Sequence, residues 1–200
     1  MSVGGTAAHL AWSDLPPDVA AAVDLARAFG FEGSCLPQHG ELLRILARGV
    51  GAGVIGETGT GCGVGLAWLA SAADADSRIV SVERDAERAA AVARLQRDDS
   101  RVLVRHGDWR ELHRYGPFDL LVLDGGGAGK KDEPPIDPLV WVKPGGLIVI
   151  DDFTPSADWP PRYHGVVDTA RQFWLDHPNL RSAPVTVAPN AVTIVATVFA

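Results

Sequence analysis

Short apolar runs alternate along the chain with segments in which apolar residues recur every three or four positions. The apolar runs lie at residues 54–57, 79–82, 102–104, 118–123 and 147–150. Segments with helical composition, 64–73 and 86–95, separate the first three runs. A continuous run such as 118–123 is typical of a parallel strand covered on both faces, and strand–helix–strand repeats build such a sheet. The pattern therefore predicts an α/β fold with a doubly wound, mostly parallel sheet.

The first 50 residues predict helices rather than strands. Residues 1–17 carry weak signals and are expected to form an arm, and Pro16-Pro17 then opens a helix. Its apolar stripe consists of Val19, Val23, Ala26 and Phe29. A second helix is expected over residues 40–50. Its expected buried residues are Leu42, Leu43, Ile45 and Leu46.

The end of the chain predicts a helix followed by a hairpin. Val166, Ala170, Phe173 and Trp174 form an amphipathic stripe. Two β-rich segments, 184–188 and 191–199, flank Pro189-Asn190, which predicts a β-hairpin and an antiparallel strand at the sheet edge. Residues 154–165 contain too many prolines for a helix, so we expect a loop. This loop is either part of a substrate pocket or lid, or a surface connection pinned by Trp159.

A glycine-rich turn follows the first apolar run. The sequence Glu57-x-Gly59-x-Gly61-x-Gly63 leads from the strand-end acid directly into the next helix. Glycine allows positive φ and close approach of a ligand, and free N–H groups at a helix start favour polar or anionic groups. The spacing does not fit the dinucleotide pattern G-x-G-x-x-G. A nucleotide-like cofactor is the first hypothesis, and a tight turn without a ligand is the alternative.

Acidic residues also follow the other predicted strands. Glu83 lies 24 residues beyond Gly59, where an acid can accept hydrogen bonds from ribose hydroxyls; the alternative is a helix-start acid, together with Asp85. Asp124 ends the fourth run, at the edge where open α/β folds bind ligands. The adjacent pair Asp151-Asp152 ends the fifth run, so three carboxylates can meet at one edge.

Composition and charge narrow the class of partner. The chain has 18 Lys and Arg against 25 Asp and Glu, a net charge of -7, and no basic cluster, which makes nucleic acid an unfavourable partner. No apolar run reaches the roughly 20 residues that span a bilayer. Two cysteines and the lack of a signal-peptide pattern favour the cytoplasm. The sequence leaves the oligomeric state open, although a homodimer is the commonest oligomer.

The glycine turn and the strand order resemble the class I S-adenosylmethionine-dependent methyltransferases. The resemblance covers most of residues 38–200 and implies a Rossmann-like, seven-stranded sheet with a C-terminal antiparallel hairpin. It implies that Glu57, Gly59, Gly61 and Gly63 hold the methionine part of the cofactor. Asp108 would meet the adenine amino group and Trp109 would cover the adenine ring. Asp108 as a helix N-cap and Trp109 as a core residue are the alternatives.

More narrowly, the chain resembles the small catechol-type O-methyltransferases. That resemblance implies a divalent metal, with Mg²⁺ suited to the oxygens of Asp124, Asp151 and Asp152. The alternative is that Asp151 and Asp152 cap backbone groups at the pocket edge. The family's lysine base, three residues after the fourth-strand acid, is replaced here by Gly127. Lys130 or Lys131 from the glycine-rich loop, or His164, are then the candidate bases.

The expected protein is therefore a single methyltransferase domain over residues 1–200, with a helical cap at 1–50 and a cofactor-binding core at 51–200. We expect S-adenosylmethionine as the cofactor, Asp124 among its neighbours, and a small-molecule hydroxyl as the methyl acceptor. Two other classes stay open. One is a non-catalytic binding or interaction module that keeps the cofactor fold, and the other, disfavoured by the glycine spacing, is a nicotinamide-dependent oxidoreductase.

Overall fold

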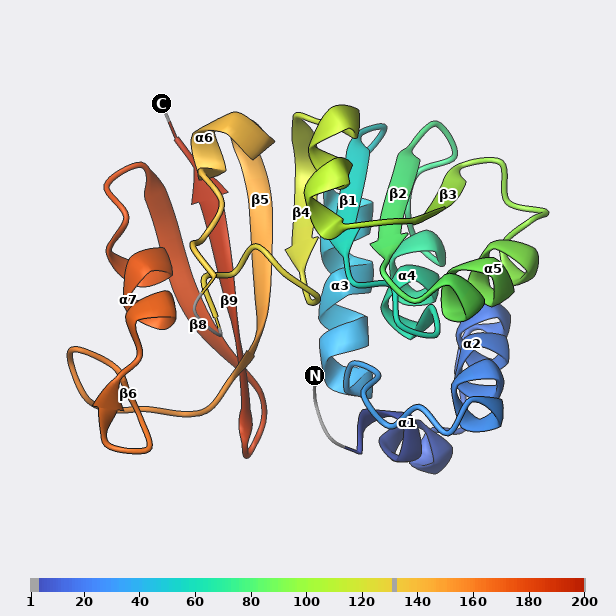
Figure 1. Cartoon of the computed structure of the whole chain (residues 1–200), viewed down its shortest axis with the longest axis horizontal. Coiled ribbons are helices and arrows are strands. Elements are labelled where there is room, and N and C mark those ends of the chain that lie inside the picture. The colour runs from blue at the N-terminus through green and yellow to red at the C-terminus, as the bar shows by residue number, and fades with distance from the viewer. Residues whose placement is uncertain (1–3, 131–132, 200) are drawn as a thin grey trace.

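A seven-stranded sheet forms the centre of the computed structural model, which describes residues 4–130 and 133–199 (Figure 1). The strands of this sheet are β1 (Val54–Thr58), β2 (Arg78–Glu83), β3 (Val102–His106), β4 (Phe118–Leu123), β5 (Val142–Phe153), β8 (Leu180–Ala188) and β9 (Ala191–Val198). Two short strands, β6 (Arg162–Tyr163) and β7 (Val166–Val167), pair separately. The helices are α1 (Gly5–Ala8), η1 (His9–Ala11), α2 (Pro17–Ala28), α3 (Pro37–Gly49), α4 (Val64–Ala70), α5 (Ala86–Leu95), η2 (Trp109–Tyr115), α6 (Pro138–Trp141) and α7 (Thr169–Asp176).

The strand order is β3-β2-β1-β4-β5-β9-β8. Strands β1 to β5 are parallel to their neighbours, whereas β9 is antiparallel to β5 and pairs with β8 as a hairpin. The predicted fold class is confirmed, including the C-terminal hairpin. The antiparallel strand is the second from the edge, because β8 takes the outer position.

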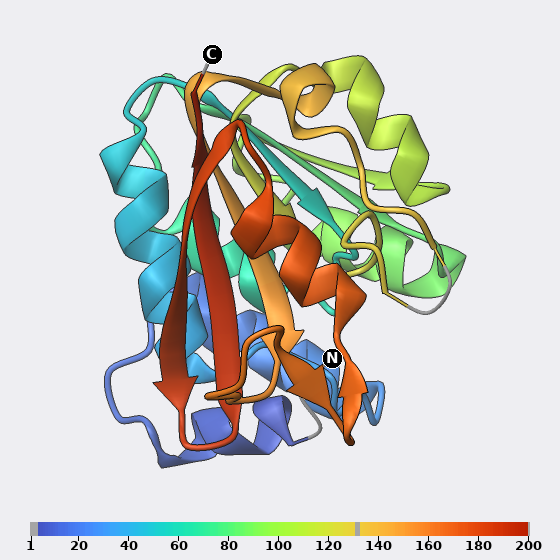
Figure 2. The ribbon, with the colours of Figure 1, turned by 90° about the vertical axis from the view of Figure 1, so that its left-hand side faces the viewer.

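Alternate side chains of the central strands point to opposite faces of the sheet and form an apolar layer on each face. Leu120 and Val122 of β4 pack with residues of α3, α4 and α5, whereas Leu121 and Leu123 face the layer that contains η2, α6 and α7. Figure 2 shows α3 and α7 on opposite sides of the sheet. Helix α2 adds an outer layer, with Val19 and Val23 packed beside Trp68 of α4. Helices therefore cover both faces of the sheet.

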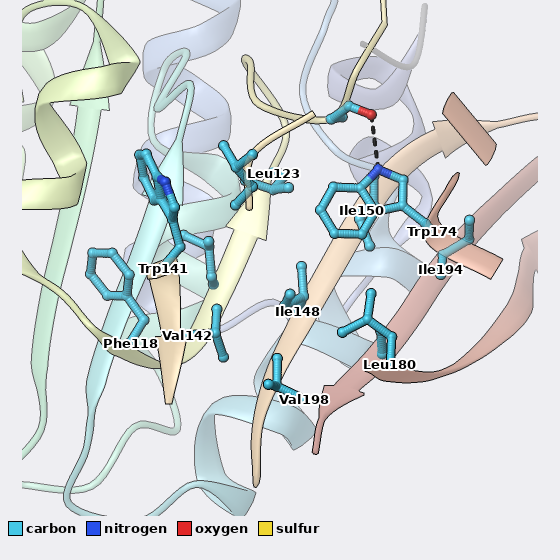
Figure 3. Close-up of a cluster of buried hydrophobic side chains, with 14 of the residues drawn as sticks. Phe118, Leu123, Trp141, Val142, Ile148, Ile150, Trp174, Leu180, Ile194 and Val198 are labelled. Atoms are coloured by element: carbon cyan, nitrogen blue, oxygen red, sulfur yellow. Dashed lines mark hydrogen bonds between the residues drawn. The ribbon is translucent and has the colours of Figure 1, made fainter. Parts of the chain in front are cut away.

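Trp174 of α7 anchors the loop that follows β4. Its ring is fully buried among the side chains of β5, β8 and β9, and its Nε1 donates a hydrogen bond to the carbonyl oxygen of Ala128 at 2.8 Å (Figure 3). A buried indole N–H needs such a partner. The pairing fixes the glycine-rich loop against α7, close to the carboxyl ends of the strands.

The structure corrects several local expectations. Helix α3 begins at Pro37, earlier than expected, and its Ile45 is 66% exposed because the helix buries the face that contains Leu43 and Ala47. Val166 lies in β7 and is 70% exposed, so it does not belong to the stripe of α7. That helix starts later because Asp168 caps it, accepting a hydrogen bond from the backbone N–H of Arg171 at 3.0 Å.

Two connections differ from their expected form. Strand β5 begins at Val142, before the apolar run at 147–150 that predicts it, and its pairing with β4 is irregular between Val142 and Leu147. The expected loop at 154–165 leads into the small β6–β7 hairpin. Among the described residues, no helix is long and apolar enough to cross a bilayer.

Candidate active site

The predicted site residues lie at the carboxyl ends of the parallel strands. Figure 1 shows the arrowheads of β1, β2 and β4 pointing toward one edge of the sheet, with α1 beyond it. Parallel strands place their terminal side chains at the same edge. Glu57, Glu83, Asp108, Asp124 and the Asp151-Asp152 pair come from five adjacent strands in this way.

The glycine turn after β1 is tightly packed against its own protein. Gly59 has a φ of +86°, and a Cβ atom there would lie 2.4 Å from the Cα of Gly125 in the loop after β4. The backbone N–H of Gly59 donates to the carbonyl oxygen of Val82 at 2.9 Å. At Gly63, a Cβ would lie 2.7 Å from Val92 of α5. Packing alone therefore accounts for two of the predicted glycines. At Gly61 the nearest atoms belong to the ring of Phe31, at 3.1 and 3.2 Å.

Glu57 is an acid buried at the end of β1. Its side chain is 2% exposed, and Ser81 of β2 donates its hydroxyl to Oε2 at 2.5 Å. A Cβ on Gly65 would lie 2.7 Å from Oε1, so the helix start also closes over this carboxyl group. Burial raises the pKa of Glu57 to about 8, although the Ser81 hydrogen bond acts in the opposite direction. The folded chain thus favours the protonated form of Glu57 more than an exposed glutamate would.

Glu83 connects the turn to the next helix. Its Oε2 accepts a hydrogen bond from the backbone N–H of Gly61 at 2.8 Å. Its Oε1 accepts from the backbone N–H of Asp85 and from the guanidinium of Arg88, both at 2.9 Å. Asp85, rather than Glu83, caps α5, and its pKa is lowered mainly by the hydrogen bond from the Arg88 backbone. Glu83 therefore orients the glycine turn directly.

Asp108 and Trp109 have partners of their own beyond β3. Asp108 caps η2 by accepting a hydrogen bond from the backbone N–H of Arg110 at 2.9 Å, as the alternative interpretation expected. The ring of Trp109 lies against Gly126, where a Cβ would come within 2.4 Å, and is 5.8 Å from the ring of Trp141. Its Nε1 donates to Glu133 at 3.0 Å. The indole therefore contributes to packing of the loop after β4.

The ends of β4 and β5 bring Asp124, Asp151 and Lys130 together. Burial, and then the nearby Asp151 carboxylate, raise the pKa of Asp124, and the Lys130 ammonium opposes this effect. Lys130 Nζ donates to the carbonyl oxygens of Asp151 and of Asp152, the latter at 2.8 Å. It also lies 4.0 Å from the ring centre of Phe153.

The Asp151 carboxylate lies in a buried polar cluster. Thr193 donates its hydroxyl to Asp151 Oδ1 at 3.1 Å, and Nδ1 of His39 lies 3.4 Å from the same oxygen. His39 comes from α3 and is 2% exposed. Asp152 has a left-handed φ of 63°. Within residues 4–130 and 133–199, no group of three His, Cys, Asp or Glu side chains is placed to hold a metal ion.

Two groups at this edge carry no sequence signal. His39 precedes the helix expected at 40–50 but lies in the first turn of α3, and Cys35 precedes α3 in an irregular segment. Burial raises the pKa of the Cys35 thiol, and Asp124, Asp151 and Glu57 are near enough to add to the shift. Only tertiary structure reveals that both lie beside the strand-end acids.

His164 is not among the groups brought together here. It lies in the turn between β6 and β7, is exposed, and stacks edge-on with Tyr163 at 4.2 Å between ring centres. The hydrogen bonds of the described residues do not connect it with Asp124 or Lys130. Lys131, the other loop candidate, lies outside the described residues.

Sequence comparison identifies a methyltransferase pattern in the same region. Residues 57–153 match the model of a family described as a methyltransferase domain. A catechol O-methyltransferase from Niastella koreensis is 32% identical over an alignment of 134 residues, and the match covers 60% of this chain and 58% of that relative. The chain thus spans less than two thirds of the relative's length.

Solved structures show the same fold over nearly the whole chain. An O-methyltransferase from Bacillus cereus, solved with SAH, has a TM-score of 0.71 and 18% identity, and the match covers 96% of each chain. The O-methyltransferase TomG from Streptomyces achromogenes, solved with SAM, has a TM-score of 0.72 and 19% identity, and the match covers 100% of both chains. The predicted resemblance to methyltransferases is therefore confirmed by sequence over residues 57–153, and the solved structures share the fold over almost the entire chain.

Proposed function

We propose that this protein is an S-adenosylmethionine-dependent methyltransferase that methylates a hydroxyl oxygen of a small molecule. The observation that carries the proposal is the pair of buried acids, Glu57 and Glu83, on either side of the glycine turn. The family match begins at Glu57 and includes Glu83. Because the paired acids are hydrogen-bond acceptors, they suit a cofactor whose amine and ribose hydroxyls are donors.

The remaining strand-end groups complete the proposed cofactor site. Glu57 would accept from the cofactor's amino group and Glu83 from the ribose hydroxyls. Asp108, which is exposed beyond β3, would accept from the adenine amino group, with Trp109 beside it. When bound, the cofactor supplies a methyl group activated by a positively charged sulfur. Asp124 lies between this part of the edge and the proposed acceptor position near β5.

The chemistry requires alignment more than it requires a reactive side chain. A lone pair of the acceptor oxygen forms the bond to the methyl carbon, and the carbon–sulfur bond breaks with its electrons retained by sulfur. The hydroxyl proton passes to water. The protein contributes by orienting the acceptor oxygen and by excluding competing geometries. The relative named catechol O-methyltransferase supports a hydroxylated aromatic acceptor, for which catechol is the first probe.

Calorimetric titration with S-adenosylhomocysteine tests the cofactor assignment. We expect micromolar binding to the wild type and about tenfold weaker binding to Glu83→Gln, equivalent to about 1.4 kcal/mol. The amide keeps one acceptor oxygen for the N–H of Gly61, so the turn should persist. Glu87→Gln is the matched control, because Glu87 is an exposed acid in the first turn of α5, the helix that follows Glu83. Absence of binding to the wild type would reject the proposed function, and equal affinity of all three proteins would remove Glu83 from the site.

A further inference from the structure

The strand-end carboxylates do not have the arrangement that a divalent metal requires. A magnesium ion needs near-octahedral oxygen ligands at about 2.0 to 2.1 Å. Asp151, a central member of the expected set, directs Oδ1 toward His39 and Thr193 on the α3 side of the sheet. Over the described ranges, 4–130 and 133–199, three acidic or histidine ligands do not converge. The residues present therefore do not fit the metal that the catechol-type resemblance implies.

A lysine ammonium lies near Asp124 and at the end of β5, where the resemblance implies the metal. Lys130 reaches back from the loop after β4, and its Nζ donates to both carbonyl oxygens at the end of β5, those of Asp151 and Asp152. The ring of Phe153 lies 4.0 Å away and adds a favourable contact with the cation. Two backbone carbonyls and an aromatic face thus bind this ammonium.

The segment that delivers Lys130 is itself anchored. Trp174 holds the carbonyl of Ala128 at 2.8 Å, and Glu133 accepts a hydrogen bond from the backbone N–H of Gly127 at 3.1 Å. Both contacts lie within three residues of Lys130. The lysine therefore starts from a fixed backbone, which favours one position for its ammonium over a broad distribution.

We propose that Lys130 supplies the cation of the acceptor site, so that methyl transfer proceeds without a divalent metal. This inference rests on the proposed function and specifies how the acceptor is bound. The ammonium attracts the acceptor oxygen, orients its lone pair, and stabilises the negative charge that it acquires as its proton leaves to water. A divalent ion placed beside the same carbonyls would be repelled by the ammonium.

Metal binding can be tested without knowing the acceptor. Mn²⁺, whose unbound form gives a paramagnetic resonance signal, is titrated into the chelator-treated full chain with S-adenosylhomocysteine present. We expect no stoichiometric binding to the wild type below millimolar Mn²⁺, and at least tenfold tighter binding to Lys130→Met, in which the carbonyls and Asp124 lose their cation. Lys143→Met is the matched control, because Lys143 pairs with Asp119 near the start of β4, remote from the strand ends, and should behave as the wild type.

Either of two results would overturn the inference. One is a micromolar Mn²⁺ site in the wild type that Asp151→Asn removes. The other is equal Mn²⁺ affinity in the wild type and in Lys130→Met, because the ammonium would then not hold a cation position. Binding of S-adenosylhomocysteine is measured in the same samples, so failure of the proposed function, seen as no cofactor binding, is distinguished from failure of this inference.

Turnover with catechol provides a second readout. We expect chelator-treated wild type to retain its rate within twofold of the rate with Mg²⁺, and Lys130→Met to lose at least 100-fold in kcat while its affinity for S-adenosylhomocysteine changes less than twofold. Lys130→Arg, which keeps the charge, should recover at least tenfold over Lys130→Met. Undiminished kcat in Lys130→Met, or activity restored to the chelated wild type only by Mg²⁺, would contradict the assignment.

Discussion

Replacing Gly59 with alanine should separate the packing role of the glycine turn from its proposed ligand role. Alanine at the observed φ of +86° costs about 1 to 2 kcal/mol, because its Cβ crowds the carbonyl oxygen in the left-handed region. The same Cβ would also lie 2.4 Å from the Cα and 2.7 Å from the nitrogen of Gly125. Backbone on both sides leaves little freedom to adjust, so overpacking adds about 1 to 3 kcal/mol. We expect a total loss of about 2 to 5 kcal/mol in the free energy of unfolding.

Gly51 provides the control for this substitution. Its φ of +61° is also left-handed, but a Cβ there meets no atom within 4 Å among the described residues. Gly51→Ala should therefore cost only the backbone part, about 1 to 2 kcal/mol. Urea unfolding, followed by the fluorescence of the buried tryptophans, measures both variants without a ligand. Equal losses in the two variants would refute the contact between the ends of β1 and β4 as the reason for glycine at position 59.

Two further substitutions test buried groups. Glu57 has a pKa of about 8 in the folded chain against an ordinary value of 4.5, so the folded state retains a proton that the unfolded state has lost. The stability of the wild type relative to Glu57→Gln should fall by up to about 1.4 kcal/mol per pH unit between pH 5 and 8, measured by urea unfolding, and a flat difference would contradict the raised pKa. Trp174→Phe should cost about 1 to 3 kcal/mol, because the carbonyl of Ala128 loses its buried donor, whereas Trp159→Phe, at a 62% exposed side chain, should change stability by less than about 0.5 kcal/mol. Similar losses for the two tryptophans would argue against the anchoring role of Trp174.

The sequence predicts the sheet well because its signals are local. Each parallel strand is a continuous apolar run, and the hairpin is marked by Pro189-Asn190 between β-rich segments. The helix phases are less certain. Ile45 and Leu43 are both large and apolar, so the sequence does not distinguish them. Leu43 is buried because its face of α3 packs against the sheet, and Ile45 is exposed because it lies on the other face. Similarly, Val166 fits the spacing of α7, but Asp168 starts the helix after it.

The sequence predicts which residues lie at the candidate site, but it does not predict which groups their side chains contact. Strand-end positions predict that Glu57, Glu83, Asp124 and Asp151 share one edge, since that follows from parallel topology. Their orientation depends on residues distant in sequence. The carboxylate of Asp151 is directed by His39 of α3 and Thr193 of β9, and neither residue lies in a recognisable motif. A ligand set inferred from strand ends alone therefore overstates how many side chains point to one place.

The acidic side chains at this edge repel one another and favour a positive charge beside the proposed acceptor position. Burial raises the pKa of both Glu57 and Asp124; beyond burial, Asp124 and Glu83 raise the pKa of Glu57, and Asp151 and Glu83 raise the pKa of Asp124. The guanidinium of Arg88 lies 2.9 Å from Oε1 of Glu83 and offsets the charge of that carboxylate. Lys130 is the lysine that acts on Asp124 in the described part of the chain, and its ammonium donates to the carbonyl oxygens of Asp151 and Asp152. Carbonyl oxygens carry no net charge, so donating to them does not cancel the positive charge of the ammonium, which can attract an acceptor oxygen while it limits repulsion among the acids. Lys130→Met removes this positive charge and Lys130→Arg keeps it, so the kcat values of the two variants should separate widely.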